Sequence, residues 1–127
     1  MQYNTQPRSS LDRELKRGVL DLVLLAMLSE RPRYGYEIVT SIVERTQGLL
    51  EVKDGTLYPV LYRLEAAGFV EAYWESPDAV QGRGMPRKYY RVTEPGQVHY
   101  RTLVEQWQTF VHAIAHIVDT PTMRSQP

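Results

Sequence analysis

The chain contains no cysteine, and its 15 Lys and Arg residues are balanced by 15 Asp and Glu residues among 127. Without thiols it can form neither a disulfide framework nor a thiolate metal site, and it lacks a thiol nucleophile. A net charge of zero means that any affinity for nucleic acid must come from the placement of charges rather than from their sum. The length fits one domain with one hydrophobic core, and no internal repeat or long linker divides it.

An apolar run long enough to cross a bilayer is also missing. The run Val19–Leu28 follows basic residues, as in a signal peptide, but Asp21 interrupts it and no small-residue cleavage site follows. We expect instead a helix over about Leu11–Ser29 that is apolar on nearly every side in its second half. The protein is therefore predicted to be cytoplasmic, with no membrane partner.

The sequence offers no arrangement typical of an enzyme. Acidic residues and a histidine are available as acids or bases, but no nucleophile, base and orienting group can be placed together. Gly82-Arg83-Gly84 is too short for a phosphate-binding loop and follows no strand-to-helix pattern. We expect no catalytic residue and no cofactor.

One pair of residues has a spacing that can hold a transition metal. His112 and His116 lie four residues apart on one face of a predicted helix, and Asp119 follows one turn later. Both histidines fall on the solvent side of that helix, where the dipole at its C-terminus favours them without a metal. The prediction is that the chain has no metal site.

The segment Asp54–Thr93 is the most informative part of the chain, because a helix, a strand, a loop and a basic strand follow one another there without interruption. Apolar residues at helical spacing form one stripe, which comprises Leu57, Leu61 and Leu64 with Val60 and Ala67 beside them. Asp54 is predicted to be the N-cap of this helix, and Gly68 is predicted to end it in a left-handed conformation. The side opposite the stripe carries groups that can contact DNA bases.

After this helix the period changes to two, which is typical of a strand from Phe69 to Glu75, and a second strand is predicted over Lys88–Thr93. Between them, Ser76–Pro86 holds two prolines and two glycines and is predicted to be a mobile loop. The hairpin is locally basic, because Ala79–Thr93 lacks acidic residues and contains Arg83, Arg87, Lys88 and Arg91. This predicts a DNA-binding wing, although an edge hairpin kept soluble by charge would have the same composition.

Two further helices are predicted outside that segment. Residues from Tyr34 to Thr46 form a short amphipathic pattern, which Gly48 closes. The last helix should span about Glu94–Asp119, with an apolar stripe at alternating spacings of three and four: Tyr100, Leu103, Trp107, Phe110, Ile114 and Ile117. Its width exceeds what one neighbour requires, so we expect it to pack on a second copy of itself and on the partner's first helix. Alternatively, the helix only completes the core of its own monomer.

Four separated motifs resemble the PadR family of bacterial and archaeal transcriptional regulators, over about Val19–Tyr100. They are Arg33-Tyr34-Gly35-Tyr36-Glu37-Ile38, then Gly55-Thr56-Leu57-Tyr58-Pro59-Val60-Leu61 with Arg63-Leu64-Glu65 and Gly68, then Arg87-Lys88-Tyr89-Tyr90, and Thr93-Glu94 with Gly96. The resemblance implies a winged helix-turn-helix dimer that binds a partly palindromic operator, usually as a repressor released by a small ligand. Only one helix follows the wing, so the chain resembles the shorter subgroup with a single C-terminal dimerisation helix.

The resemblance also implies a place for the ligand. In this family an aromatic residue on the dimerisation helix can line a cavity at the dimer centre where planar ligands stack, and Trp107 holds a suitable position. A tryptophan in an apolar stripe is more often an ordinary core residue. The chain departs from the family pattern at Lys53-Asp54, which could alter operator preference, and at Pro95, which should matter little.

The resulting prediction is a mainly α (α+β) winged helix-turn-helix with a two-stranded β wing and a long C-terminal dimerisation helix. The DNA-binding domain should cover residues 1–93, the dimerisation helix 94–119, and a disordered tail 120–127, with residues 1–10 partly disordered. The predicted DNA contacts are Tyr34, Lys53, Gly55, Thr56, Tyr58, Pro59, Tyr62, Arg63, Arg83, Arg87 and Lys88. The predicted dimer interface is Leu15, Leu22, Tyr100, Leu103, Trp107, Phe110, Ile114 and Ile117. The expected partners are double-stranded DNA, a second copy of the chain and a small aromatic effector; the alternative is a winged helix used only for protein contacts.

Overall fold

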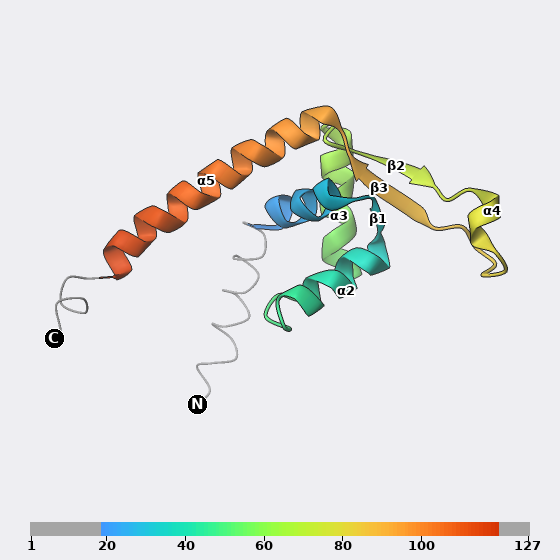
Figure 1. The fold of residues 1–127 in the computed structure, drawn as a ribbon, viewed down its shortest axis with the longest axis horizontal. Helices are drawn as coiled ribbons and strands as arrows, with labels where there is room; N and C mark the ends of the chain where they lie inside the picture. The colour runs from blue at the N-terminus through green and yellow to red at the C-terminus, as the bar shows by residue number, and fades with distance from the viewer. Residues whose placement is uncertain (1–18, 120–127) are drawn as a thin grey trace.

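The computed structural model describes residues 19–119. A helix of residues 19–30 is followed by β1 (Arg33–Tyr34), α2 (Gly35–Arg45), α3 (Asp54–Ala66), β2 (Val70–Trp74), α4 (Pro77–Val80), β3 (Lys88–Val92) and α5 (Glu94–Val118). The helix of residues 19–30, α2 and α3 pack together beside a small sheet. The β2–β3 hairpin and α5 project from this body on opposite sides (Figure 1).

The core lies around the helix of residues 19–30, as its apolar composition predicts. Leu24 and Leu25 of this helix are completely buried, as are Ile38 of α2 and Leu57 and Leu61 of α3. The apolar stripe expected on α3 is thus confirmed, except that Ala67 is exposed. Ala67 is the C-cap, where the chain has already begun to turn away from the core.

The sheet has three antiparallel strands in the order β1-β3-β2. The predicted two-stranded wing is confirmed as the β2–β3 hairpin, but the third strand, β1, was not predicted. Arg33 and Tyr34 pair with Tyr90 and Tyr89 along the otherwise free edge of β3. The prediction that a helix starts at Tyr34 is also wrong, because this residue is extended and α2 begins at Gly35. β1 thus forms hydrogen bonds with backbone groups of β3 that would otherwise depend on water.

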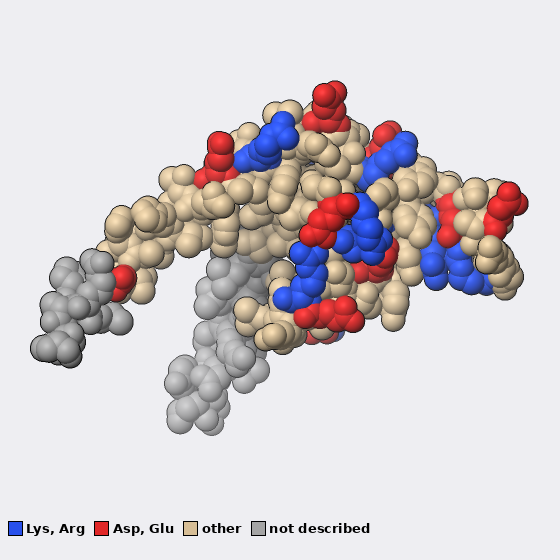
Figure 2. Space-filling view, in the orientation of Figure 1, with Lys and Arg blue, Asp and Glu red and all other residues tan. Residues whose placement is uncertain are grey.

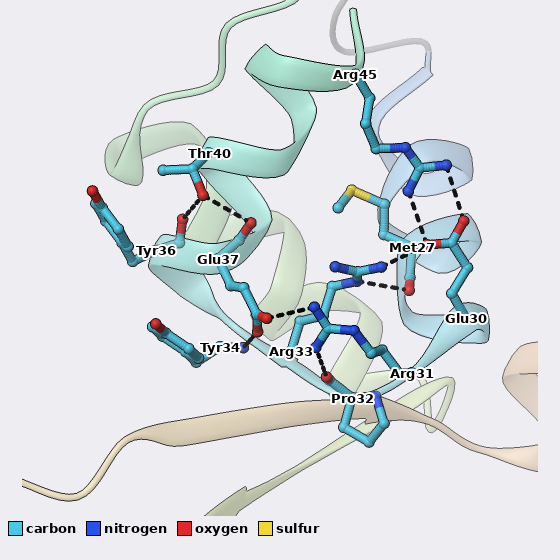
Figure 3. A network of polar contacts seen from close by, with 10 residues as sticks. All are labelled: Met27, Glu30, Arg31, Pro32, Arg33, Tyr34, Tyr36, Glu37, Thr40 and Arg45. Atoms are coloured by element: carbon cyan, nitrogen blue, oxygen red, sulfur yellow. Dashed lines mark hydrogen bonds and ion pairs between the residues drawn. The ribbon is translucent and has the colours of Figure 1, made fainter.

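Arg33 joins the first helix, the sheet and α2 through a network of charged groups (Figure 3). Its guanidinium is buried and donates to the backbone oxygen of Met27 at 3.1 Å and to Glu30 at 2.5 Å. Arg45 of α2 binds both oxygens of Glu30, at 2.8 and 2.9 Å. These hydrogen bonds lower the pKa of Glu30, with Arg45 the largest cause. A buried charge needs such partners to offset its lost hydration.

The ends of α3 agree with the sequence at one terminus and not at the other. Gly68 has φ of +83°, so it ends the helix in the left-handed conformation as predicted. At the start, the N-cap is Lys53 and Asp54 is the first helical residue, so the predicted cap was wrong by one position. The carbonyl of Lys53 already accepts from the amides of Thr56 and Leu57, both at 2.9 Å, which places Asp54 inside the first turn.

The start of α5 is anchored tightly against the segment that joins α3 to β2. The hydroxyl of Thr93 accepts from the Gly96 amide at 3.1 Å and donates to the Gly68 carbonyl at 2.6 Å. The ring of Phe69 stacks on His99, with centroids 4.2 Å apart. A Cβ on Gly96 would lie 1.9 Å from the Phe69 carbonyl oxygen, so only glycine permits this approach.

Replacing Gly96 by alanine should therefore destabilise the fold. Relieving the contact requires α5 or the start of β2 to move, and forced overpacking of this kind costs about 1–3 kcal/mol in the free energy of unfolding. Urea denaturation followed by circular dichroism measures the change. Gly55→Ala is the matched control, because nothing lies within 4 Å of a Cβ there and alanine favours the helix. Equal stability of both variants would contradict the assigned role of Gly96.

Candidate nucleic-acid interface

The exposed side of α3 carries most of the residues predicted to contact DNA. Lys53, Thr56, Pro59 and Tyr62 are exposed near the N-terminal half of the helix. The space beside Gly55 is open, so a backbone or a phosphate could approach the first turn closely. Pro59 lies inside α3 without ending it. The structure thus brings a hydrogen-bonding and apolar surface together on one helix.

Tyr58 and Tyr34 are less accessible than the sequence suggests. Tyr58 is half-buried, and its hydroxyl end lies against Gly35 at the start of α2. Burial is the largest cause of the raised pKa of this phenol, with Asp54 adding to it. The hydroxyl therefore stays protonated at neutral pH and can act as a donor. Tyr34 is also half-buried, with its ring against Tyr89 of β3 at 5.4 Å.

Arg63 is held by a partner that the sequence did not indicate. Its guanidinium makes two hydrogen bonds to Asp21 in the helix of residues 19–30, both of 2.8 Å. This bidentate pairing with a carboxylate raises the pKa of Arg63, chiefly through the hydrogen bonds. Arg63 could contact DNA only by sharing or releasing Asp21. The two residues are 42 positions apart, so no local pattern could reveal the pair.

The loop of the wing is more structured than predicted, because it contains the short helix α4. Arg83 donates to Glu75 at 2.6 Å and to the Ala79 carbonyl at 3.2 Å, which ties the loop back to the end of β2. Glu75 also accepts from the backbone amide of Arg87 at 3.1 Å. The bond from Arg83 is the largest cause of the lowered pKa of Glu75, so the carboxylate stays charged at neutral pH.

The wing's four basic residues consequently fall into two pairs. Arg83 and Arg91 each form a salt bridge with a glutamate of the adjoining strand or its end, Arg91 with Glu71 at 3.1 Å. Among the described residues, the side chains of Arg87 and Lys88 form no salt bridge, although, besides Arg83, the charge of Arg87 helps to lower the pKa of Glu75. The Arg87 guanidinium lies 4.3 Å from the centre of the Tyr34 ring, which supports it without cancelling its charge. Figure 2 shows basic side chains gathered on the wing beside α4.

The residues predicted for a dimer interface divide between the core and the surface. Leu15 lies outside the described residues, and Leu22 is half-buried beside a hollow between its helix and α2. Tyr100 and Leu103 pack against the core of their own chain. The remaining four are exposed on the free part of α5, at 42% for Trp107, 60% for Phe110, 41% for Ile114 and 72% for Ile117. A shallow depression beside Phe110 does not include Trp107.

Two histidines lie four residues apart near the C-terminal end of α5. His112 and His116 do face each other, with ring centroids 4.7 Å apart. Residues 19–119 nevertheless contain no group of three or more His, Cys, Asp or Glu side chains placed to hold a metal ion. None of the helices in that range has the length and apolar character needed to cross a membrane.

The likeness to known proteins covers most of the chain. Residues 24–102 match the profile of the family described as "Transcriptional regulator PadR-like family". A protein of Lysinibacillus sphaericus is 39% identical over 94 residues, which are 74% of this chain and 83% of that protein. Among solved structures, a PadR family transcriptional regulator from Eggerthella lenta is 31% identical, with a TM-score of 0.78 over 94% of this chain and 99% of the other. A transcriptional regulator from Clostridium thermocellum is 33% identical, with a TM-score of 0.70 over 80% and 94%. The chain, with its winged helix and long C-terminal helix, belongs to the PadR-like family of transcriptional regulators.

Proposed function

We propose that this DNA-binding regulator is a homodimeric repressor that holds a partly palindromic operator through α3 and the β2–β3 wing. In this proposal α3 enters the major groove and the wing lies along the neighbouring phosphates. A small aromatic ligand at the dimer centre releases the protein from DNA. Family membership supports the regulatory role, and the arrangement of charge on the wing supports the mode of contact.

The observation that carries the proposal is the unequal pairing of charges on the wing. Internal pairing of all four basic residues would leave an ordinary solvated hairpin. Instead, Arg87 and Lys88 form no side-chain salt bridge among the described residues, and they lie immediately before and at the start of β3, the central strand of the sheet. Cations on the wing can bind phosphates, while the exposed face of α3 can contact bases.

The second copy is proposed from the exposed apolar face of α5. Large side chains from Trp107 to Ile117 would leave a substantial hydrophobic surface in water if the chain were a monomer. A two-fold partner that packs on this face would cover it and would also set two copies of α3 at a fixed separation. Operator half-sites about 34–36 Å apart would then be bound together.

Trp107 is proposed to contact the ligand only within that dimer. The indole is partly exposed on α5, and the shallow depression beside Phe110 does not include it. A symmetry mate would place a second indole nearby, and two aromatic faces can enclose a planar compound. Ligand binding that changes the packing of α5 would alter the separation of the two DNA-binding surfaces, which is how release would follow.

Neutralising the free cations of the wing tests the proposed DNA contact. The purified protein should retard the DNA upstream of its own gene in an electrophoretic assay. The double substitution Arg87→Gln, Lys88→Gln should weaken binding to all sequences alike and reduce the slope of log affinity against log salt by about 0.9 for each lost phosphate contact. Arg91→Gln is the control, because its charge is already paired with Glu71. An absence of binding to any genomic fragment would favour a winged helix used only for protein contacts.

Truncating Trp107 tests the dimer. Trp107→Ala removes a large aromatic from both sides of the proposed two-fold axis, and losses of this size in cores cost on the order of 3 to 5 kcal/mol. Sedimentation equilibrium should show weaker association, and operator affinity should fall with it. Gln108→Ala, an exposed polar position on α5, should change neither. A Trp107→Ala protein that remains fully associated with unchanged operator affinity would place the interface elsewhere.

Fluorescence of Trp107 tests the ligand. In a Trp74→Phe background, which leaves Trp107 as the sole tryptophan, a planar aromatic compound should quench the emission and reduce operator binding. Operator DNA should weaken the binding of that compound by the same factor, because coupling between two binding sites is reciprocal. If saturating operator DNA leaves the quenching unchanged, binding of the compound is not coupled to DNA binding, and the proposed regulatory role of the ligand is contradicted.

A further inference from the structure

Trp74 is the largest exposed apolar side chain of the wing, and it lies on the side of the sheet that faces the core. Alternation along β2 places Val70, Ala72 and Trp74 on one face. Val70 is buried and Ala72 packs against the core, but Trp74 lies beyond the core and is 63% exposed. Single exposed apolar residues are common on protein surfaces, so exposure alone assigns no role.

The neighbour of Trp74 makes this position unusual. Lys88 lies directly opposite on β3, and its ammonium nitrogen is 5.8 Å from the centre of the Trp74 ring and 5.8 Å from that of Tyr90. Among residues 19–119, no acidic side chain forms a salt bridge with Lys88. The Trp74 indole and the Lys88 ammonium group, which has no salt bridge among the described residues, therefore lie next to each other at one end of this face.

On the opposite face of the sheet, the aromatic rings contact one another, and arginine side chains of the same chain lie over them. There the rings of Tyr34, Tyr89 and Tyr73 pack in a row, with centroid distances of 5.4 and 5.8 Å. Arg87 lies over Tyr34 at one end and Arg91 over Tyr73 at the other, at 4.3 and 4.7 Å. Trp74 has no comparable ring contact among the described residues. Its indole is thus open to a partner beyond the described residues.

The chemistry of that partner follows from the pair. A protein surface would need a wider apolar patch than one indole to bind stably. The backbone of double-stranded DNA presents an apolar deoxyribose beside each phosphate, which matches an indole next to an ammonium group. The indole also adjoins Lys88, one of the two wing cations that form no salt bridge among the described residues.

We infer that Trp74 lies against the deoxyribose of the DNA strand whose phosphate Lys88 binds. The inference rests on the proposed function, because it requires the wing to lie along DNA. The indole would contribute a contact that is neither ionic nor specific for sequence, and it would fix the depth at which the wing sits on the strand. Its signature is an effect on affinity without an effect on salt dependence.

Binding measured across a series of salt concentrations tests this signature. Trp74→Ala should weaken binding to operator and to random duplex by about tenfold each, as expected for the loss of about half of a buried aromatic contact, with an unchanged salt slope. Lys88→Gln should instead reduce the slope by about 0.9. Val98→Ala, an exposed apolar position on α5, is the control and should leave affinity unchanged. Thermal unfolding should give the same midpoint for Trp74→Ala and wild type, because the side chain lies outside the core.

A spectroscopic readout is independent of affinity. In a Trp107→Phe protein, Trp74 is the only tryptophan, and its quenching by acrylamide can be compared with and without duplex DNA. Duplex DNA should shield Trp74 from the quencher. If duplex binds but neither shielding nor loss of affinity occurs, Trp74 remains in water and the inference fails while the proposed function stands. If Trp74 is shielded more strongly by single-stranded DNA than by duplex, the indole stacks on bases and the inference also fails. If the wild type binds no DNA, the proposed function itself fails.

Discussion

The close approach of Gly96 to the Phe69 carbonyl is the constraint on which the arrangement of the molecule depends. Phe69 follows the glycine that ends α3, and Gly96 lies in the first turn of α5. One short junction therefore fixes both the position of the exposed helix and the direction in which α5 leaves the sheet. Because the contact is made between backbones, it cannot be adjusted by rotating a side chain. The wing and α5 project on opposite sides of this junction (Figure 1).

The elements that could be predicted from the sequence are those in which burial follows a simple period. The leucines of α3 recur every three or four residues, and the structure buries them. The last helix was expected over Glu94–Asp119 and is found over Glu94–Val118. Gly68 could be recognised because few residues other than glycine adopt positive φ at a helix end. In each case a local rule and the tertiary packing favour the same conformation.

The features that could not be predicted depend on partners distant in the sequence. Asp21 and Arg63 meet only because α3 packs beside the first helix, and β1 exists only because β3 offers a free edge. The wing appeared uniformly basic along the chain, since the glutamates that neutralise Arg83 and Arg91 lie on the other strand. The face of α5 beyond Leu103 has no covering element among the described residues, so its partner cannot be read from one chain.

The internal pairing of the wing's charges has a consequence for how the protein reaches DNA. With a net charge of zero the protein has no large overall positive charge, and ions in the cell screen the field of single cations such as Arg87 and Lys88 within about 8 Å. A field of that reach does not steer the molecule from a distance, so association should fall in the unsteered range of about 10⁵–10⁶ per molar per second. Discrimination between operator and other DNA then resides in how long each complex lasts, which is set by short-range contacts rather than by the approach.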